Sequence, residues 1–148
     1  MLLLLAQIAA TWTMVGLIWF VQIVHYPLFA QVGMNLFPAY ETAHNRLTTW
    51  VVGPPMLVEG VTAIGLLLYK PDGISSGLVW CGLMLLLAIW ASTAFLQVPQ
   101  HDILTRGFDG EAHRFLVTSN WLRTIAWTLR GVLVLVMVGA AMNNVRIP

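Results

Sequence analysis

Four long apolar segments are the feature that most constrains this chain of 148 residues. They cover about residues 2–26, 47–69, 76–98 and 119–142. Each is close to the roughly 20 apolar residues that a helix needs to cross a hydrocarbon layer about 30 Å thick. Backbone polar groups must find partners inside the segment in lipid, so we expect helices. The short connections predict one all-α domain over residues 1–148, an integral membrane up-down-up-down four-helix bundle.

The second segment contains two adjacent prolines, Pro54 and Pro55, which remove backbone donors inside the helix. A helix that began only at Pro55 would reach about 22 Å, too short to span the hydrocarbon layer. We therefore predict a proline-kinked second helix that begins near Pro38 or Glu41. The kink serves helix packing or widens a pocket at its depth, and the sequence leaves both interpretations open.

Prolines and capping residues predict the remaining helix ends. Pro27 and Pro99 are expected to stop the first and third helices, because proline cannot continue the hydrogen-bond ladder. Ser75 and Ser76 precede the third segment as predicted caps. The run from Thr118 to Asn120 precedes the fourth segment in the same way.

The chain is far too weakly charged to serve a polyanionic partner. It has seven Lys and Arg against six Asp and Glu, which gives a net charge of +1. Nucleic-acid binding is therefore excluded. Cys81 is the single cysteine, so neither an internal disulfide nor a Cys-x-x-Cys zinc or redox motif can form.

The histidines gather at one end of the predicted bundle. His25 closes the first helix, His44 opens the second, His101 follows the third, and His113 precedes the fourth. Because the helices alternate in direction, all four lie on one side of the membrane. Four acidic residues fall on the same side: Glu41, Asp102, Asp109 and Glu111. This concentration predicts a functional site there.

Polar residues inside three of the segments recur on single helix faces. At 100° per residue, such faces must turn toward the bundle interior rather than toward lipid. The stripes are Gln7, Thr11, Gln22 and His25 in the first helix; Glu41, His44, Thr48, Glu59 and Thr62 in the second; and Asn120, Arg123, Trp127 and Arg130 in the fourth.

Glu59 and Arg130 lie deepest among the charged residues, in helices that run in the same direction. A lone charge at the bilayer centre costs at least about 2.5 to 3.5 kcal/mol, so we predict that the two residues pair directly or through water. Such a pair either fixes the register of the helices or anchors or protonates the polar headgroup of a bound molecule. In the second interpretation, Glu59 and Arg130 join Glu41 as candidate catalytic residues, and Arg123 extends the polar track.

Three histidines and one glutamate are the candidate metal ligands: His25, His44, His101 and Glu41. Imidazole suits iron, copper and zinc, and Glu41-x-x-His44 has the spacing that di-iron bundles use. Only one such pair occurs. Gln22-x-x-His25 has the same spacing, but with Gln in place of Glu, so a mononuclear site is easier to assemble. Two of the imidazoles could instead ligate a haem. Interfacial histidines also act as hydrogen-bonding caps or proton carriers without a metal.

Two short motifs carry a family resemblance. The segments VPQHDIL (residues 98–104) and SNWLRT (residues 119–124) resemble the end of the third helix and the start of the fourth in small membrane proteins related to anthrone oxygenases. The run from His25-Tyr26-Pro27 to His44 is also similar to bacterial members of this kind. The resemblance implies a four-helix protein of the bacterial inner membrane that oxygenates polycyclic aromatic molecules. His101 departs from the family pattern, which often has Asn at that position.

These observations together favour an integral-membrane oxidoreductase or oxygenase. It would admit a lipophilic molecule, aromatic or quinone-like, between its helices. The candidate substrate-binding residues are Gln22, Asn120, Arg123 and Trp127. The alternative is a non-enzymatic small membrane subunit or carrier that binds a lipid or a partner protein, and the sequence leaves a homo-oligomer open.

Overall fold

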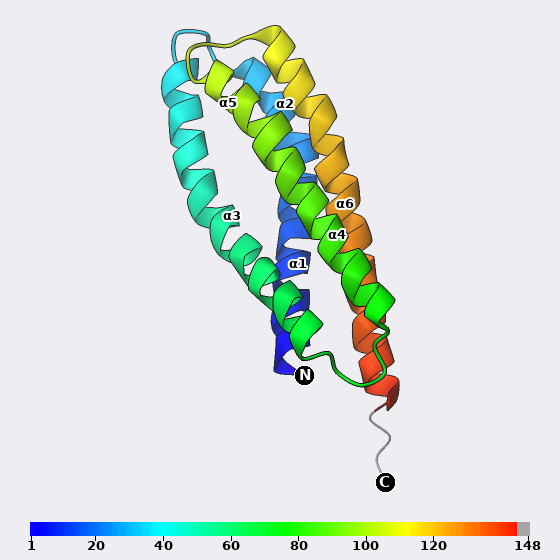
Figure 1. Ribbon diagram of the computed structural model, residues 1–148. Helices are drawn as coiled ribbons and strands as arrows, with labels where there is room; N and C mark the ends of the chain where they lie inside the picture. Colours follow the sequence, from blue (N-terminus) through cyan, green and yellow to red (C-terminus); the bar gives the residue numbers. More distant parts are fainter. Residues whose placement is uncertain (145–148) are drawn as a thin grey trace.

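Four membrane-length helices lie side by side in the computed structural model, which describes residues 1–144 (Figure 1). The continuous helical segments are Leu2–Gln31, Phe37–Leu68, Ser76–Leu104 and Gly110–Asn144, and each is long and apolar enough to cross a membrane. The described residues contain no strand. The predicted all-α membrane bundle is confirmed, although the helices extend beyond the predicted spans.

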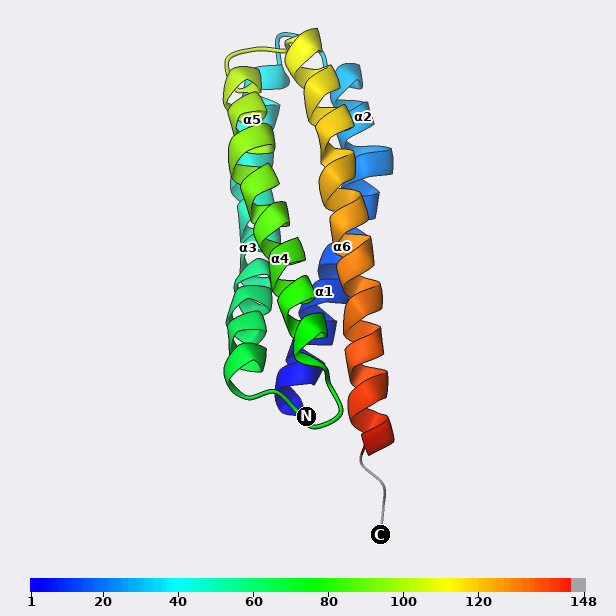
Figure 2. The same cartoon turned by 45° about the vertical axis from the view of Figure 1, so that its right-hand side comes forward.

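The helices alternate in direction and form a closed square. α1 (Leu2–Phe20) packs against α3 (Phe37–Leu68) and α6 (Gly110–Asn144), and α4 (Ser76–Ser92) packs against the same two helices. The N-terminus and the end of α6 lie at one end of the bundle (Figures 1 and 2). The opposite end, here called the histidine end, holds α2 (Tyr26–Leu28), α5 (Val98–Leu104) and the start of α6.

The bundle has an apolar outer surface, as expected of a protein whose solvent is lipid, and its apolar core also contains many polar side chains. Large apolar side chains are exposed along every long helix, for example Leu57 and Val61 on α3 and Leu122 on α6. The predicted polar stripes face inward, with only His25 and Thr48 partly exposed. The buried polar and charged residues are Gln7, Thr11, Gln22, Glu41, His44, Glu59, Thr62, Gln97, Ser119, Asn120, Arg123, Thr124 and Arg130.

Pro27 and Pro99 do not end their helices, which corrects the predicted boundaries. A short π-helix precedes each proline: η1 (Val21–His25) precedes Pro27, and η3 (Thr93–Gln97) precedes Pro99. A proline ring clashes with the carbonyl four residues earlier, which here belongs to the wider π turn. The helix therefore passes the proline, to a final turn η2 (Phe29–Gln31) in the first segment and to Leu104 in the third.

The second helix begins at Phe37, as predicted from the proline pair. Pro54 and Pro55 lie inside α3, which changes direction along its length (Figure 1). The fourth helix begins at Gly110, so Ser119 and Asn120 lie within it rather than before it. Asp109 is the actual cap, because its Oδ1 accepts the backbone N–H groups of Glu111 and Ala112 at 2.9 Å.

The predicted cap at Ser75 is confirmed. Its hydroxyl oxygen accepts the backbone N–H of Leu78 at 3.3 Å, which satisfies a free donor at the start of α4.

Gly60 allows a close contact between α3 and α4. A Cβ atom at this position would lie 2.9 Å from Cη2 of Trp90, inside the van der Waals contact distance. The absence of a side chain therefore allows the indole of Trp90 to lie against the backbone of α3. A cleft lies between the two helical segments on the side of this contact that faces the histidine end.

We expect Gly60→Leu to lower the melting temperature of the detergent-purified protein by several degrees, because the new side chain displaces the Trp90 ring and separates α3 from α4. Gly16→Leu is the matched control, since nothing lies within 4 Å of a Cβ atom at Gly16. Thermal unfolding followed by circular dichroism measures both. Equal melting temperatures for the two variants would contradict the packing role of Gly60.

Candidate metal centre and adjoining cleft

Helical extension past the prolines brings the site residues together. Glu41 and His44 lie three residues apart on one face of α3. His101 lies on α5, two residues beyond the proline that was expected to end the third helix. Tyr26 begins α2, directly after η1 and before Pro27. His101 therefore joins the residues of α3 only because the third helical segment continues past Pro99.

Glu41, His44 and His101 form a group that could hold a metal ion. Each offers a ligand atom, and these atoms all lie within 4.8 Å of one another. Oε1 of Glu41 lies 2.5 Å from Nδ1 of His101. Oε2 is buried without a hydrogen-bond partner among the described residues, and the Glu41 side chain is fully buried. A carboxylate oxygen in that position is stabilised by a proton, a cation or a water molecule that donates to it.

His25, a predicted ligand, lies outside this group and contacts it from behind. Its Nε2 is 2.8 Å from Nδ1 of His44, and the hydroxyl of Thr48 is 3.0 Å from the same nitrogen. Both contacts engage Nδ1, which leaves Nε2 of His44 for a metal. The close pairing also leaves no room for a haem plane between the imidazoles of His25 and His44, so the arrangement favours an ion over haem.

Tyr26 is a site residue that the sequence analysis missed. Its hydroxyl lies 2.9 Å from Nε2 of His101 and accepts a hydrogen bond from Nη2 of Arg123 at 3.2 Å. The side chain is buried. Its position next to His25 in the sequence could have indicated a place in the site. The helix was predicted to end at Tyr26, however, so there was no reason to expect the Tyr26 side chain to point into the bundle.

Gln22 and Asn120 hold Arg123 in place. Gln22 donates to the carbonyl of Val117 at 3.1 Å and accepts from the Asn120 side-chain amide at 2.8 Å. Oδ1 of Asn120 then accepts the Nε–H of Arg123 at 2.9 Å and a second bond from Nη2. Two of the four predicted substrate-binding residues, Gln22 and Asn120, therefore lie behind the cleft, whereas Arg123 and Trp127 line it.

A cleft lies between α3 and the α4–α5 segment at the histidine end. Its upper chamber of about 300 Å³ reaches the metal group through His44 and His101 and includes Asn45, Gln97 and Asp102. A smaller chamber of about 70 Å³ lies deeper. The chambers adjoin each other and share six lining residues: Tyr26, His44, Thr48, Val52, Thr93 and Arg123.

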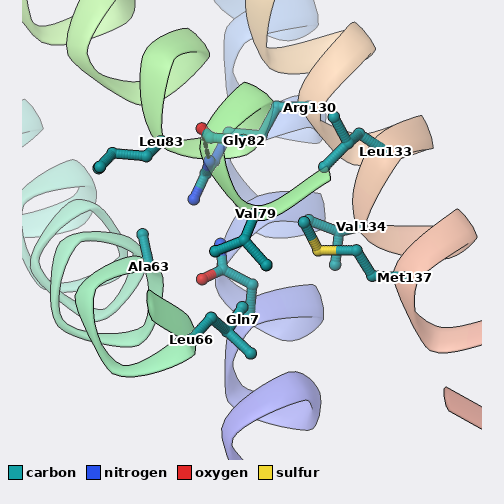
Figure 3. A pocket seen from close by; sticks show the side chains of 10 residues that line it. All are labelled: Gln7, Ala63, Leu66, Val79, Gly82, Leu83, Arg130, Leu133, Val134 and Met137. Atoms are coloured by element: carbon teal, nitrogen blue, oxygen red, sulfur yellow. Dashed lines mark hydrogen bonds between the residues drawn. The ribbon is translucent and has the colours of Figure 1, made fainter. Parts of the chain in front are cut away.

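Glu59 and Arg130 pair directly, as predicted, with Nε of Arg130 3.0 Å from Oε1 of Glu59. The same carboxylate accepts hydrogen bonds from Thr11 at 2.8 Å and from the Trp127 indole at 3.0 Å. Nη1 of Arg130 donates to the Gly82 carbonyl (Figure 3). The pair thus connects α1, α3, α4 and α6.

Neither Glu59 nor Arg130 lines the cleft. Arg130 borders only a void of about 10 Å³, close to the space that one water molecule occupies (Figure 3). Nη2 of Arg130 is buried without a hydrogen-bond partner among residues 1–144. A water in the void would satisfy that donor. This geometry supports the interpretation that the pair fixes helix register, rather than the catalytic one.

Comparison of this chain with protein-family models, curated proteins and solved structures finds no match. The resemblance to membrane proteins related to anthrone oxygenases therefore stays a prediction. Function must be inferred from the chemistry of the site.

We expect Glu59→Gln to destabilise the protein strongly, because it leaves the Arg130 guanidinium buried without a counter-ion, a loss of about 3 to 5 kcal/mol. The double variant Glu59→Gln/Arg130→Gln should regain part of this loss, since no charge remains unpaired. Denaturation in detergent measures both. Glu111→Gln, which breaks an exposed 3.8 Å pair with Arg114, is the control and should have no measurable effect. A single variant at least as stable as the double variant would contradict the pairing argument.

Proposed function

We propose that this chain is an integral-membrane oxidoreductase that holds one transition-metal ion at Glu41, His44 and His101. Its substrate is a lipophilic molecule, aromatic or quinone-like, that reaches the ion through the cleft between α3 and α4–α5. The observation that carries the proposal is the buried, unpartnered Oε2 of Glu41 beside two imidazoles.

The donor set suits a redox metal. Two imidazole nitrogens and one carboxylate oxygen are the ligands of many non-haem iron sites, and imidazole also binds copper and zinc. Three protein ligands leave coordination positions open for substrate or oxygen. Of these metals, iron or copper would supply electron transfer, whereas zinc would supply only Lewis-acid chemistry.

Residues behind the ligands support the same assignment. Metal-binding histidines commonly use their second ring nitrogen in a hydrogen bond that fixes the ring. His44 has such a partner in His25, and His101 has one in Tyr26. These contacts orient both imidazoles before any ion binds, so less conformational freedom is lost on binding.

The cleft supports a lipophilic substrate. Its upper chamber includes His44 and His101, so a bound molecule lies beside the proposed ligands. Its deeper chamber has mainly apolar walls, including Met14, Ile18 and Met56. A molecule dissolved in the bilayer can approach between two helices without crossing the aqueous phase. The non-enzymatic alternative, a subunit or carrier, would need the cleft but not the metal.

Elemental analysis and absorption spectroscopy of the detergent-purified protein test the proposal. We expect stoichiometric iron or copper in the wild type and loss of the metal in Glu41→Gln, His44→Ala and His101→Ala. His25→Ala should retain the site with about 10- to 100-fold weaker affinity, because it removes only a supporting hydrogen bond.

His113→Ala is the matched control. It lies at the same end of the bundle, but its Nε2 contacts the carbonyl of Tyr26 at 2.8 Å rather than the metal group. It should bind metal as the wild type does. A folded wild-type protein that takes up no iron, copper or zinc after reconstitution would overturn the proposed metal site and favour the carrier alternative.

A further inference from the structure

Arg123 is a buried cation that no carboxylate neutralises in the described part of the chain. Its side chain is on α6 and the residue is only 8% exposed. The ion pairs within residues 1–144 are those of Glu41 with His101, Glu111 with Arg114, and Glu59 with Arg130. The hydrogen bonds of Arg123 go to neutral oxygens of Asn120, Tyr26 and Thr93.

Arg130, the other buried arginine, has the carboxylate partner that Arg123 lacks among the described residues. Arg130 donates to the carboxylate of Glu59, so its charge is balanced inside the bundle. A guanidinium in a membrane interior is costly without such a partner, and such residues commonly mark a binding site or pathway. Because Arg123 has only neutral acceptors, an anionic group of a ligand would balance its charge.

Arg123 lies where such a ligand could reach it. The residue lines both chambers of the cleft, so it stands at the boundary between the polar upper part and the apolar deeper part. Tyr26 lines both chambers as well, and its hydroxyl accepts a bond from Arg123. An oxygen anion placed here would contact the guanidinium while the remainder of the molecule extended into the deeper chamber.

The walls of the deeper chamber suit an aromatic ring. Met14 and Met56 supply thioether sulfurs, which make favourable contacts with ring edges. Trp127 adds an indole whose N–H is already bonded to Glu59, so its ring carbons are the part left for a ligand. Val52 narrows the same chamber from α3.

We propose that Arg123 is the anion-recognition residue of the cleft and that its ligand is an aromatic oxyanion, a phenolate or an arene carboxylate. The oxyanion contacts Arg123, and the ring lies across the two adjoining chambers, with Met14, Met56 and Trp127 at its inner end. This inference rests on the proposed function for the cleft as the substrate site and names the substrate class. It assigns to Arg123 the polar-group recognition that the sequence analysis considered for Glu59 and Arg130.

Calorimetry on metal-free, chelator-treated protein in a neutral detergent tests the inference independently of the metal. The probes are naphthoate, its uncharged methyl ester and a dinitronaphtholate. We expect both anions to bind one per chain, naphthoate at least about tenfold tighter than its ester, the effect of one charged hydrogen bond. Naphthoate bound no tighter than its ester would overturn the inference.

Variants locate the binding. Arg123→Gln should remove the preference for naphthoate over its ester, and Arg123→Lys should restore part of it. Val52→Trp should weaken all three probes by filling the chamber. The controls are Arg114→Gln, an exposed arginine on the same helix, and Leu57→Trp on the outer face of α3. Melting curves confirm that each variant is folded. Wild-type naphthoate affinity in folded Arg123→Gln would overturn the inference.

Further outcomes distinguish this inference from binding of a lipid anion and from the proposed metal site. Displacement of naphthoate by phosphatidylglycerol at lower concentration than by the dinitronaphtholate would overturn the aromatic assignment in favour of a lipid anion. Naphthoate binding by a protein that never takes up metal would support the inference while overturning the oxidoreductase proposal. Metal uptake without naphthoate binding would do the reverse.

Discussion

Neutralisation of buried charge is the constraint on which the rest of this bundle depends. Glu59 and Arg130 lie deep in an apolar layer, where either charge alone would destabilise the fold. Their contact fixes the relative height of α3 and α6. The bonds from Thr11 to the carboxylate and from Arg130 to Gly82 add α1 and α4 to the same level. With all four helices held there, the distant histidine end has a defined geometry.

The histidine end differs from the deep pair in what it leaves unsatisfied. Around Glu59 the polar atoms have protein partners, and one water-sized void serves the remaining donor of Arg130. At the histidine end, Oε2 of Glu41 has no donor among the described residues. Arg123 has hydrogen-bond partners there but no carboxylate within residues 1–144 to balance its charge. Glu41 lies beside the imidazoles of His44 and His101, and Arg123 lines the cleft. The first arrangement stabilises the fold, and we propose that the second binds a ligand.

The sequence predicted what depends on apolar length and helical period: four spanning helices, inward polar stripes and the pair of Glu59 with Arg130. It did not predict that the first and third helices pass Pro27 and Pro99. That outcome depends on π turns, which local sequence does not specify. Each π turn contains a glutamine, Gln22 or Gln97, that hydrogen-bonds to α6. The helix end predicted at Tyr26 also gave no reason to expect that side chain in the site, and His25 stays a predicted ligand outside the group of Glu41, His44 and His101. The resemblance to membrane proteins related to anthrone oxygenases and the redox chemistry of the site stay predictions.

The cleft between α3 and α4–α5 has a consequence for how any ligand is delivered. In the function that we propose, the ligand enters the cleft from the bilayer, so occupancy of the site depends on the mole fraction of ligand in the bilayer rather than on its concentration in water. Partition into the membrane then acts as a first selection step, before any contact with the protein. A weakly soluble aromatic molecule would occupy such a site at aqueous concentrations far below its dissociation constant measured in micelles.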